Sequence, residues 1–130
     1  MKKVLIIIFC LSFILFSCAS IESIKDGKSD GTVVVYKTSL ENAWVYAKKI
    51  FNENGVEIRE EHINESIFGK SEPRNDDMGF FIGVWLRPIT DNEVEVTSYS
   101  EKALATKPTL GVVFTSKEFH EQFKIYVDTE

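Results

Sequence analysis

The chain has 130 residues, enough for one modest domain, and carries 15 lysines and arginines against 20 aspartates and glutamates. Its formal net charge of −5 at pH 7 argues against nonspecific nucleic-acid binding, which depends on neutralising phosphates. The only cysteines are Cys10 and Cys18, so the sequence after residue 18 offers no disulfide, zinc-thiolate site or thiol nucleophile.

Residues 1–17 have the pattern of a secretory signal peptide. Lys2 and Lys3 precede an apolar run from Val4 to Phe16. At about 1.5 Å of helix per residue, this run is too short for a bilayer core of about 30 Å. Small residues then follow, as a cleavage region requires. Removing this segment shifts the net charge of the remaining chain from −5 to about −7.

The sequence Leu15-Phe16-Ser17-Cys18 resembles a bacterial lipobox at the end of that segment. The resemblance implies a diacylglyceryl group on the Cys18 thiol, cleavage just before Cys18 and, in many bacteria, acylation of the new amine by a fatty acid such as palmitate. Two or more acyl chains give stable membrane anchoring. The alternatives are an ordinary signal peptide with a chance cysteine, or an uncleaved anchor.

Residue 19 and the segment after it bear on location and reach. Ala19 stands where enteric lipoproteins retained in the inner membrane carry Asp, which favours an outer membrane, facing the periplasm. Residues 18–31 are expected to form the lipidated Cys18 and a flexible tether, because small and charged residues dominate and Gly27 and Gly31 break regular structure. A single domain is expected at residues 32–130.

This domain is predicted to open with a strand and a helix. Residues 32–37 are rich in β-branched and aromatic types, which favours a strand. Residues 38–41 have the pattern of a capping box with Thr38 as N-cap, and Gly55 suits the left-handed position after the helix. The apolar face of this helix is expected to consist of Leu40, Ala43, Trp44, Ala47, Ile50 and Phe51.

Hairpin strands and a second helix are predicted to complete the domain. Alternating patterns predict strands at 56–61, 66–72, 79–87 and 93–100. Gly69 indicates a bulge or a close backbone approach, and Pro88 is expected to end a strand. Residues 101–111 are less regular, and 112–114 form either a short strand or an apolar staple. A second capping box, from Thr115 to Glu118, opens a helix whose apolar face consists of Phe119, Phe123, Tyr126 and Val127.

The element order β-α-β-β-β-β-α predicts an α+β fold, an antiparallel sheet of four to five strands with two helices packed on one face. This order resembles that of small helix-on-sheet domains in envelope lipoproteins, such as those in the C subunit lipoprotein of the β-barrel assembly machinery. The resemblance covers residues 32–130 and rests on element order alone.

No motif indicates catalysis or a metal. His62 and His120 are interpreted as exposed structural residues, because no Glu-x-x-His or His-x-x-x-His spacing accompanies them. Asn75, Asp76 and Asp77 offer oxygens to a cation, but without an EF-hand pattern a solvated loop is the simpler interpretation. Nucleophile-elbow and phosphate-binding glycine patterns are absent from the sequence. We therefore expect no enzyme activity, no cofactor and no metal, with a hydrolase as a distant third hypothesis.

The remaining candidate is the sheet face opposite the helices. Phe81, Trp85 and Tyr99 fall on one parity of adjacent strands, and exposed aromatic patches often mark binding sites. The alternatives are that these residues are core while Phe80 and its even-numbered neighbours point outward, or that both faces are buried. The leading hypothesis is a non-enzymatic domain that docks an envelope protein or is structural. The second is small-molecule or lipid binding in a groove between helices and sheet.

Overall fold

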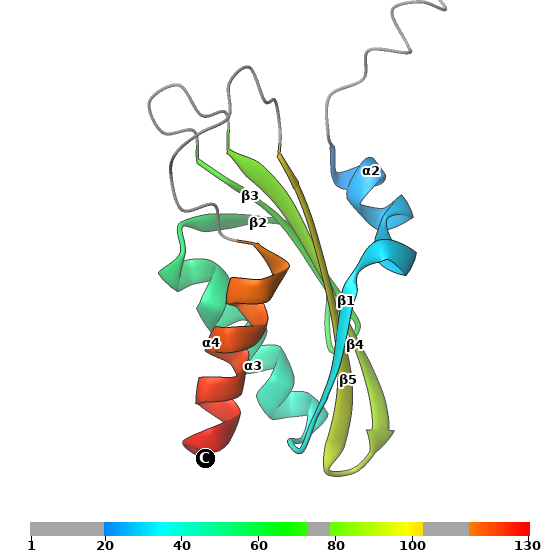
Figure 1. Ribbon diagram of the computed structural model, residues 1–130, viewed down its shortest axis with the longest axis vertical. Helices are drawn as coiled ribbons and strands as arrows, with labels where there is room; N and C mark the ends of the chain where they lie inside the picture. Colours follow the sequence, from blue (N-terminus) through cyan, green and yellow to red (C-terminus); the bar gives the residue numbers. More distant parts are fainter. Residues whose placement is uncertain (1–19, 73–78, 103–114) are drawn as a thin grey trace, which may run out of the picture.

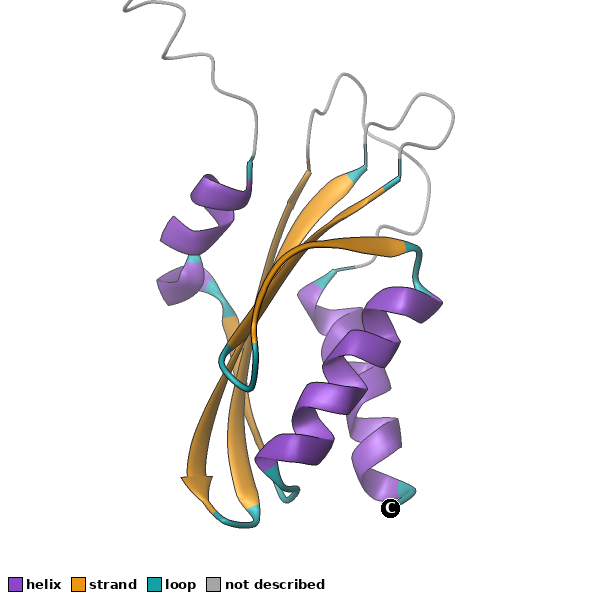
Figure 2. Cartoon of the chain, turned by 180° about the vertical axis from the view of Figure 1, so that it is seen from behind, coloured by secondary structure: helices purple, strands orange, loops and turns teal. Residues whose placement is uncertain are grey.

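The computed structural model describes residues 20–72, 79–102 and 115–130. Five strands form one antiparallel sheet in the order β1-β5-β4-β3-β2. Helices α3 and α4 cover one face, here called the inner face, and α2 lies on the opposite, outer face (Figures 1 and 2). The elements are α2 (Ile21–Asp26), the 3-10 turn η1 (Lys28–Asp30), β1 (Thr32–Tyr36), α3 (Leu40–Glu53), β2 (Val56–His62), β3 (Ser66–Ser71), β4 (Phe80–Thr90), β5 (Glu93–Lys102) and α4 (Ser116–Asp128).

This arrangement confirms the predicted α+β fold and adds a third helix. The lipobox with Cys18, the loop with Asp76 and Asp77, and residues 103–114 lie outside the described residues, and so do the expectations made for them. The two helices that the sequence predicted, α3 and α4, pack together on the inner face (Figure 1).

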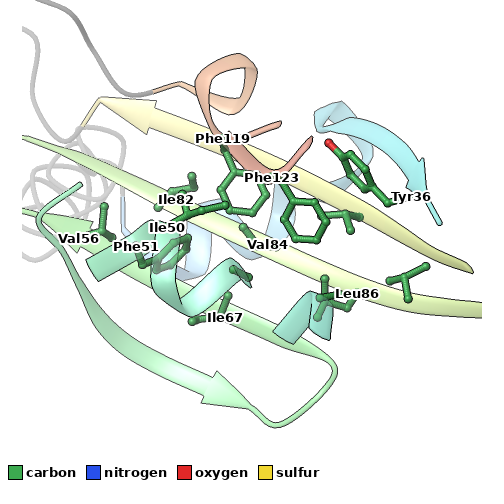
Figure 3. Close-up of a cluster of buried hydrophobic side chains, with 14 of the residues drawn as sticks. Tyr36, Ile50, Phe51, Val56, Ile67, Ile82, Val84, Leu86, Phe119 and Phe123 are labelled. Atoms are coloured by element: carbon green, nitrogen blue, oxygen red, sulfur yellow. The ribbon is translucent and has the colours of Figure 1, made fainter. Parts of the chain in front are cut away.

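The inner face carries the core. Phe51 on α3 and Phe119 and Phe123 on α4 are 0% exposed, and the ring centroids of Phe51 and Phe119 lie 6.3 Å apart. These rings pack over even-numbered β4 residues, such as Ile82 and Val84, which are also fully buried (Figure 3). Each such side chain contributes roughly 1.5–3 kcal/mol through burial. The predicted parity is confirmed: the even-numbered residues of β4 point inward.

The start of α3 differs by one residue from the prediction. Ser39 is the N-cap, and its hydroxyl accepts a hydrogen bond from the Asn42 amide at 3.1 Å. The Thr38 hydroxyl donates instead to the Glu130 carboxylate, which also accepts a hydrogen bond from the Tyr46 hydroxyl at 2.6 Å. Glu130, far along the chain, therefore accepts a hydrogen bond from the hydroxyl that the local pattern assigned to the cap. Through these bonds Glu130 connects the end of α4 to α3.

Strand β4 runs through Pro88 to Thr90, although the sequence predicted its end at Arg87. Strand β3 pairs with β4 only as far as Trp85, so the missing amide hydrogen of Pro88 removes no ladder bond to β3. Pro88 still lies opposite Val94 in β5. Of the two features expected at Gly69, a bulge or a close backbone approach, the close approach is confirmed, because a β-carbon there would lie 2.8 Å from the Glu57 carbonyl oxygen.

Residues 20–31 differ from the flexible tether that the sequence predicted. Ser20 and Ser23 form a reciprocal capping box that opens α2, and Ile24 is 0% exposed against the sheet. Gly27 ends the helix, and η1 then leads directly into β1. The described part of this segment therefore has regular structure and packs on the outer face of the sheet.

Candidate docking surface

The structure places Phe81, Trp85 and Tyr99 on the outer face together. Phe81 lies opposite Glu101, and Trp85 opposite Thr97, on the neighbouring strand β5. Residues at this spacing share one face because strand side chains alternate. All three aromatic side chains are partly exposed. The sequence prediction that they share a face is therefore confirmed.

Helix α2 covers the middle of this face through one apolar side chain. Ile24 sits over Gly83 of β4, where an added β-carbon would lie 2.6 Å from Ile24 Cγ2 and 2.9 Å from Trp85 Cη2. Phe68 on β3 lines the same hollow, is only 2% exposed and meets the Trp85 ring edge-on at 5.4 Å. The absence of a side chain at Gly83 makes the hollow that receives Ile24.

The end of α2 lies equally close to β5. A β-carbon at Gly27 would lie 2.0 Å from Tyr99 Cε1, so any larger residue would push the helix away from the Tyr99 ring. The Tyr99 hydroxyl donates to Glu101 at 2.5 Å, and this hydrogen bond raises the pKa of Tyr99 to about 12. The hydroxyl is therefore protonated at neutral pH. Tyr99 is therefore largely covered by the protein itself.

Polar contacts hold α2 in register over the hollow. Lys25 Nζ lies 2.7 Å from Glu60 Oε2 on β2 and 5.4 Å from the centroid of the Phe68 ring. Its hydrogen bond lowers the pKa of Glu60 below the ordinary range. Ser23 Oγ donates to Glu101 at 3.1 Å. The ion pair is partly exposed to solvent and contributes little stability, so these contacts mainly set the position of α2.

The outer face also presents charges beside its aromatic residues. The Lys28 ammonium lies 6.0 Å from the Trp85 ring, and the Lys70 ammonium 5.5 Å from the Phe81 ring. Arg87 Nη2 lies 2.6 Å from Glu95 Oε2, and this hydrogen bond raises the pKa of Arg87. The outer face thus combines aromatic side chains with neighbouring charged side chains.

Sequence reasoning did not assign α2 to this surface. The available signal was local: a Ser-x-x-Ser pattern at Ser20 and Ser23, followed by Ile24. Because serine and isoleucine are common in linkers as well, the signal becomes decisive only when Gly83 is known to lie beneath Ile24.

The two histidines differ in environment. His62 is exposed, as predicted, and its Nε2 lies 3.0 Å from Glu60 Oε2. His120 is only 8% exposed, so its interpretation as an exposed residue is wrong. Its Nε2 lies 2.9 Å from the Thr32 carbonyl and its Nδ1 lies 2.6 Å from the Tyr36 hydroxyl. Because a carbonyl only accepts, Nε2 carries the proton and Nδ1 accepts one from Tyr36. Both ring nitrogens are thus engaged inside the fold.

Core side chains occupy the space between helices and sheet where the second hypothesis placed a ligand (Figure 3). An open depression of about 310 Å³ lies elsewhere, where the start of α3 meets the β2–β3 turn and the β4–β5 hairpin. Its lining consists of Ser39, Leu40, Glu41, Asn64, Pro88, Thr90 and Asp91.

Within the described ranges, no three His, Cys, Asp or Glu side chains gather in a way that could hold a metal ion. Nor does any helix in those ranges have the length and apolar character needed to cross a membrane. No protein-family model and no curated protein matches the sequence. A functional assignment therefore rests on the motif at Cys18 and on the geometry of the outer face.

Proposed function

We propose that this protein is a bacterial envelope lipoprotein, anchored by lipid on Cys18, whose domain docks a protein partner without enzymatic activity. The observation that carries the docking role is the joint presence of Phe81, Trp85 and Tyr99, partly exposed, on the outer face. The lipobox supports the anchor, and Ala19 supports an outer membrane, with the domain in the periplasm.

The composition of the outer face supports a protein partner. Binding energy at protein interfaces concentrates in aromatic and arginine side chains that are surrounded by polar groups. Phe81 and Trp85 supply the aromatic part, while Lys70 and the Arg87–Glu95 pair supply the charged surround. An acidic domain has no attraction of its own for an anionic lipid surface, so the lipid provides attachment and the face remains available to protein.

Partner capture from intact membranes tests the docking role. Phe81 is a better probe than Trp85, because the Trp85 ring packs against Phe68 beneath α2 and its loss would also disturb the fold. We expect Phe81→Ala to lower the yield of crosslinked partner about tenfold or more, as truncation of an interface hot spot does. Val45→Ala is the matched control, since Val45 is 57% exposed on α3. Equal yields from the two variants would contradict docking at this face.

Membrane fractionation of Cys18→Ala tests the anchor separately. The variant is expected to leave the membrane fraction, because it lacks the thiol that would carry the lipid. If it stays membrane-bound through an uncleaved N-terminal segment, the lipoprotein assignment is wrong, whatever Phe81→Ala does.

A further inference from the structure

The two edges of the sheet differ sharply in chemistry. Strand β2 has the sequence VEIREEH, with four charged side chains and a register shift between Ile58 and Glu60. Charges and irregular pairing are the features by which natural proteins prevent an edge from joining another strand. Strand β1 has the sequence TVVVY, with no charge and no proline, and it pairs with β5 in one unbroken register.

The unprotected edge is also exposed. Val33 is 54% and Val35 is 48% exposed, both on the outer face. In the described part of the chain, no backbone hydrogen bond beyond the β5 ladder involves Val33, Val34 or Val35. The one described side-chain bond to this backbone runs from His120 to the Thr32 carbonyl, at the start of the strand.

We propose that β1 pairs antiparallel with β1 of a second copy of this chain, centred on Val34. This register places Val33 of each copy opposite Val35 of the other on the outer face, and β-branched residues form favourable cross-strand pairs. The two exposed valines thereby cover each other, and the two sheets become one.

The charges that flank β1 select the antiparallel orientation. Asp30 precedes the strand and Lys37 follows it, and both are exposed. Antiparallel pairing about Val34 places Lys37 of each copy opposite Gly31 of the other, one residue from Asp30. Parallel pairing in register would put Lys37 next to Lys37, and like charges in opposed positions are destabilising. The flanks thus favour one orientation of the two copies.

The symmetry of this pairing suits attachment to a single membrane. The two-fold axis runs perpendicular to the joined sheet, so both outer faces and both α2 helices lie on the same side. A pair of five-residue strands is a small interface and is weak between freely diffusing proteins. Confinement to a membrane raises the effective concentration, and this step rests on the proposed lipid anchor.

Mixed disulfide formation in membranes tests the register. A full-length Val33→Cys chain with one tag is coexpressed with a Val35→Cys chain carrying another tag, and the membranes are oxidised. Directly opposed residues in a strand pair have Cα atoms about 4.5–5.5 Å apart, within disulfide range. We expect mixed-tag dimers at least fivefold above a Val33→Cys with Val45→Cys control, with the wild-type chain giving the baseline from Cys10 and Cys18. A yield equal to the control, or bridges mainly between identical Val33→Cys chains, would overturn the proposed pairing.

Charge exchange at the flanks tests the orientation without touching the strand. Lys37→Glu and Asp30→Lys should each lower the mixed-tag yield about two- to fivefold, and the double variant should restore it. Failure of the double variant to recover would overturn the orientation. If the protein proves not to be membrane-anchored, the same oxidation on concentrated soluble chain still decides the pairing, so the two proposals fail separately.

Discussion

At the residue scale, one buried polar group links the sheet to α4. The His120 ring joins Tyr36 and Thr32, both from β1, while Phe123 packs 4.5 Å from the Tyr36 ring. Burial lowers the pKa of His120 and raises that of Tyr36. Both side chains are therefore neutral at pH 7, and their hydrogen bonds satisfy groups that would otherwise be buried unpaired.

His120 should make the domain less stable in mild acid. Its folded-state pKa lies below the ordinary value of 6.5, so below about pH 6.5 the unfolded chain binds a proton that the folded chain resists. The free energy of unfolding is then full above about pH 6.5 and falls as the pH drops through the region below it. Denaturant unfolding at intervals between pH 7.5 and 5 measures this slope.

The His120→Gln variant identifies the group responsible for the slope. The amide of Gln retains a donor for the Thr32 carbonyl but does not titrate, so the slope should flatten, with about 1–3 kcal/mol lost at pH 7.5 from the imperfect replacement. The exposed His62→Gln variant should keep the wild-type slope. An unchanged slope in His120→Gln would show that other groups cause the acid sensitivity.

At the element scale, the sequence predicted the elements that are specified by residues within the element itself. The capping box from Thr115 to Glu118 and the spacing of Phe119 and Phe123 specify α4 locally, and the structure confirms them. Helix α2 has only six residues, too few to be stable alone, and one buried anchor in Ile24. Its position depends on Gly83, which is distant in sequence.

The candidate docking surface also has a part that the sequence predicts and a part that it does not. Parity alone placed Phe81, Trp85 and Tyr99 on one side of the sheet, because alternation along strands is a local property. Parity says nothing about which segment covers them. Nor does it show that the Thr38 hydroxyl turns to Glu130 in place of capping α3. Contacts between remote residues decide both outcomes.

Ile24→Ser should release α2 while the rest of the domain stays folded. The substitution removes a fully buried apolar side chain, and truncations of this kind cost about 2–5 kcal/mol. A short helix held by one anchor can lose that amount by opening locally. Hydrogen exchange should therefore speed up at the α2 and η1 amides of Ile24, Gly27 and Asp30, with little change in β4 and β5.

Ile125→Ser is the matched control for that prediction, since Ile125 is 62% exposed on α4 and its loss should change stability by about 0.5 kcal/mol or less. Faster exchange throughout β4 and β5 in Ile24→Ser would instead make α2 part of the cooperative core.

At the scale of the whole molecule, α2 changes how the proposed anchor holds the domain. A flexible tether over residues 19–31 would give a mean reach of about 20 Å. Because Ser20 is the N-cap of α2, a chain that starts at lipidated Cys18 would have only Cys18 and Ala19 before this cap, a span of at most about 7 Å. With the proposed anchor, the docked helix would keep the acidic domain close to the bilayer, even though anionic lipid repels its charge.

The gap between bilayer and protein should therefore depend on Ile24. Neutron reflectometry of the lipidated protein, starting at Cys18, on a supported bilayer is expected to show a gap of about 10 Å or less. Only two residues, Cys18 and Ala19, separate Ser20 from the lipid, and they limit its distance from the bilayer. In Ile24→Ser, the freed residues up to Gly31 should widen the gap by about 10–20 Å, and more on anionic lipid at low salt, where repulsion is least screened. Ile125→Ser should match the wild type. An equal gap in Ile24→Ser and wild type would mean that α2 does not control the height of the domain above the membrane.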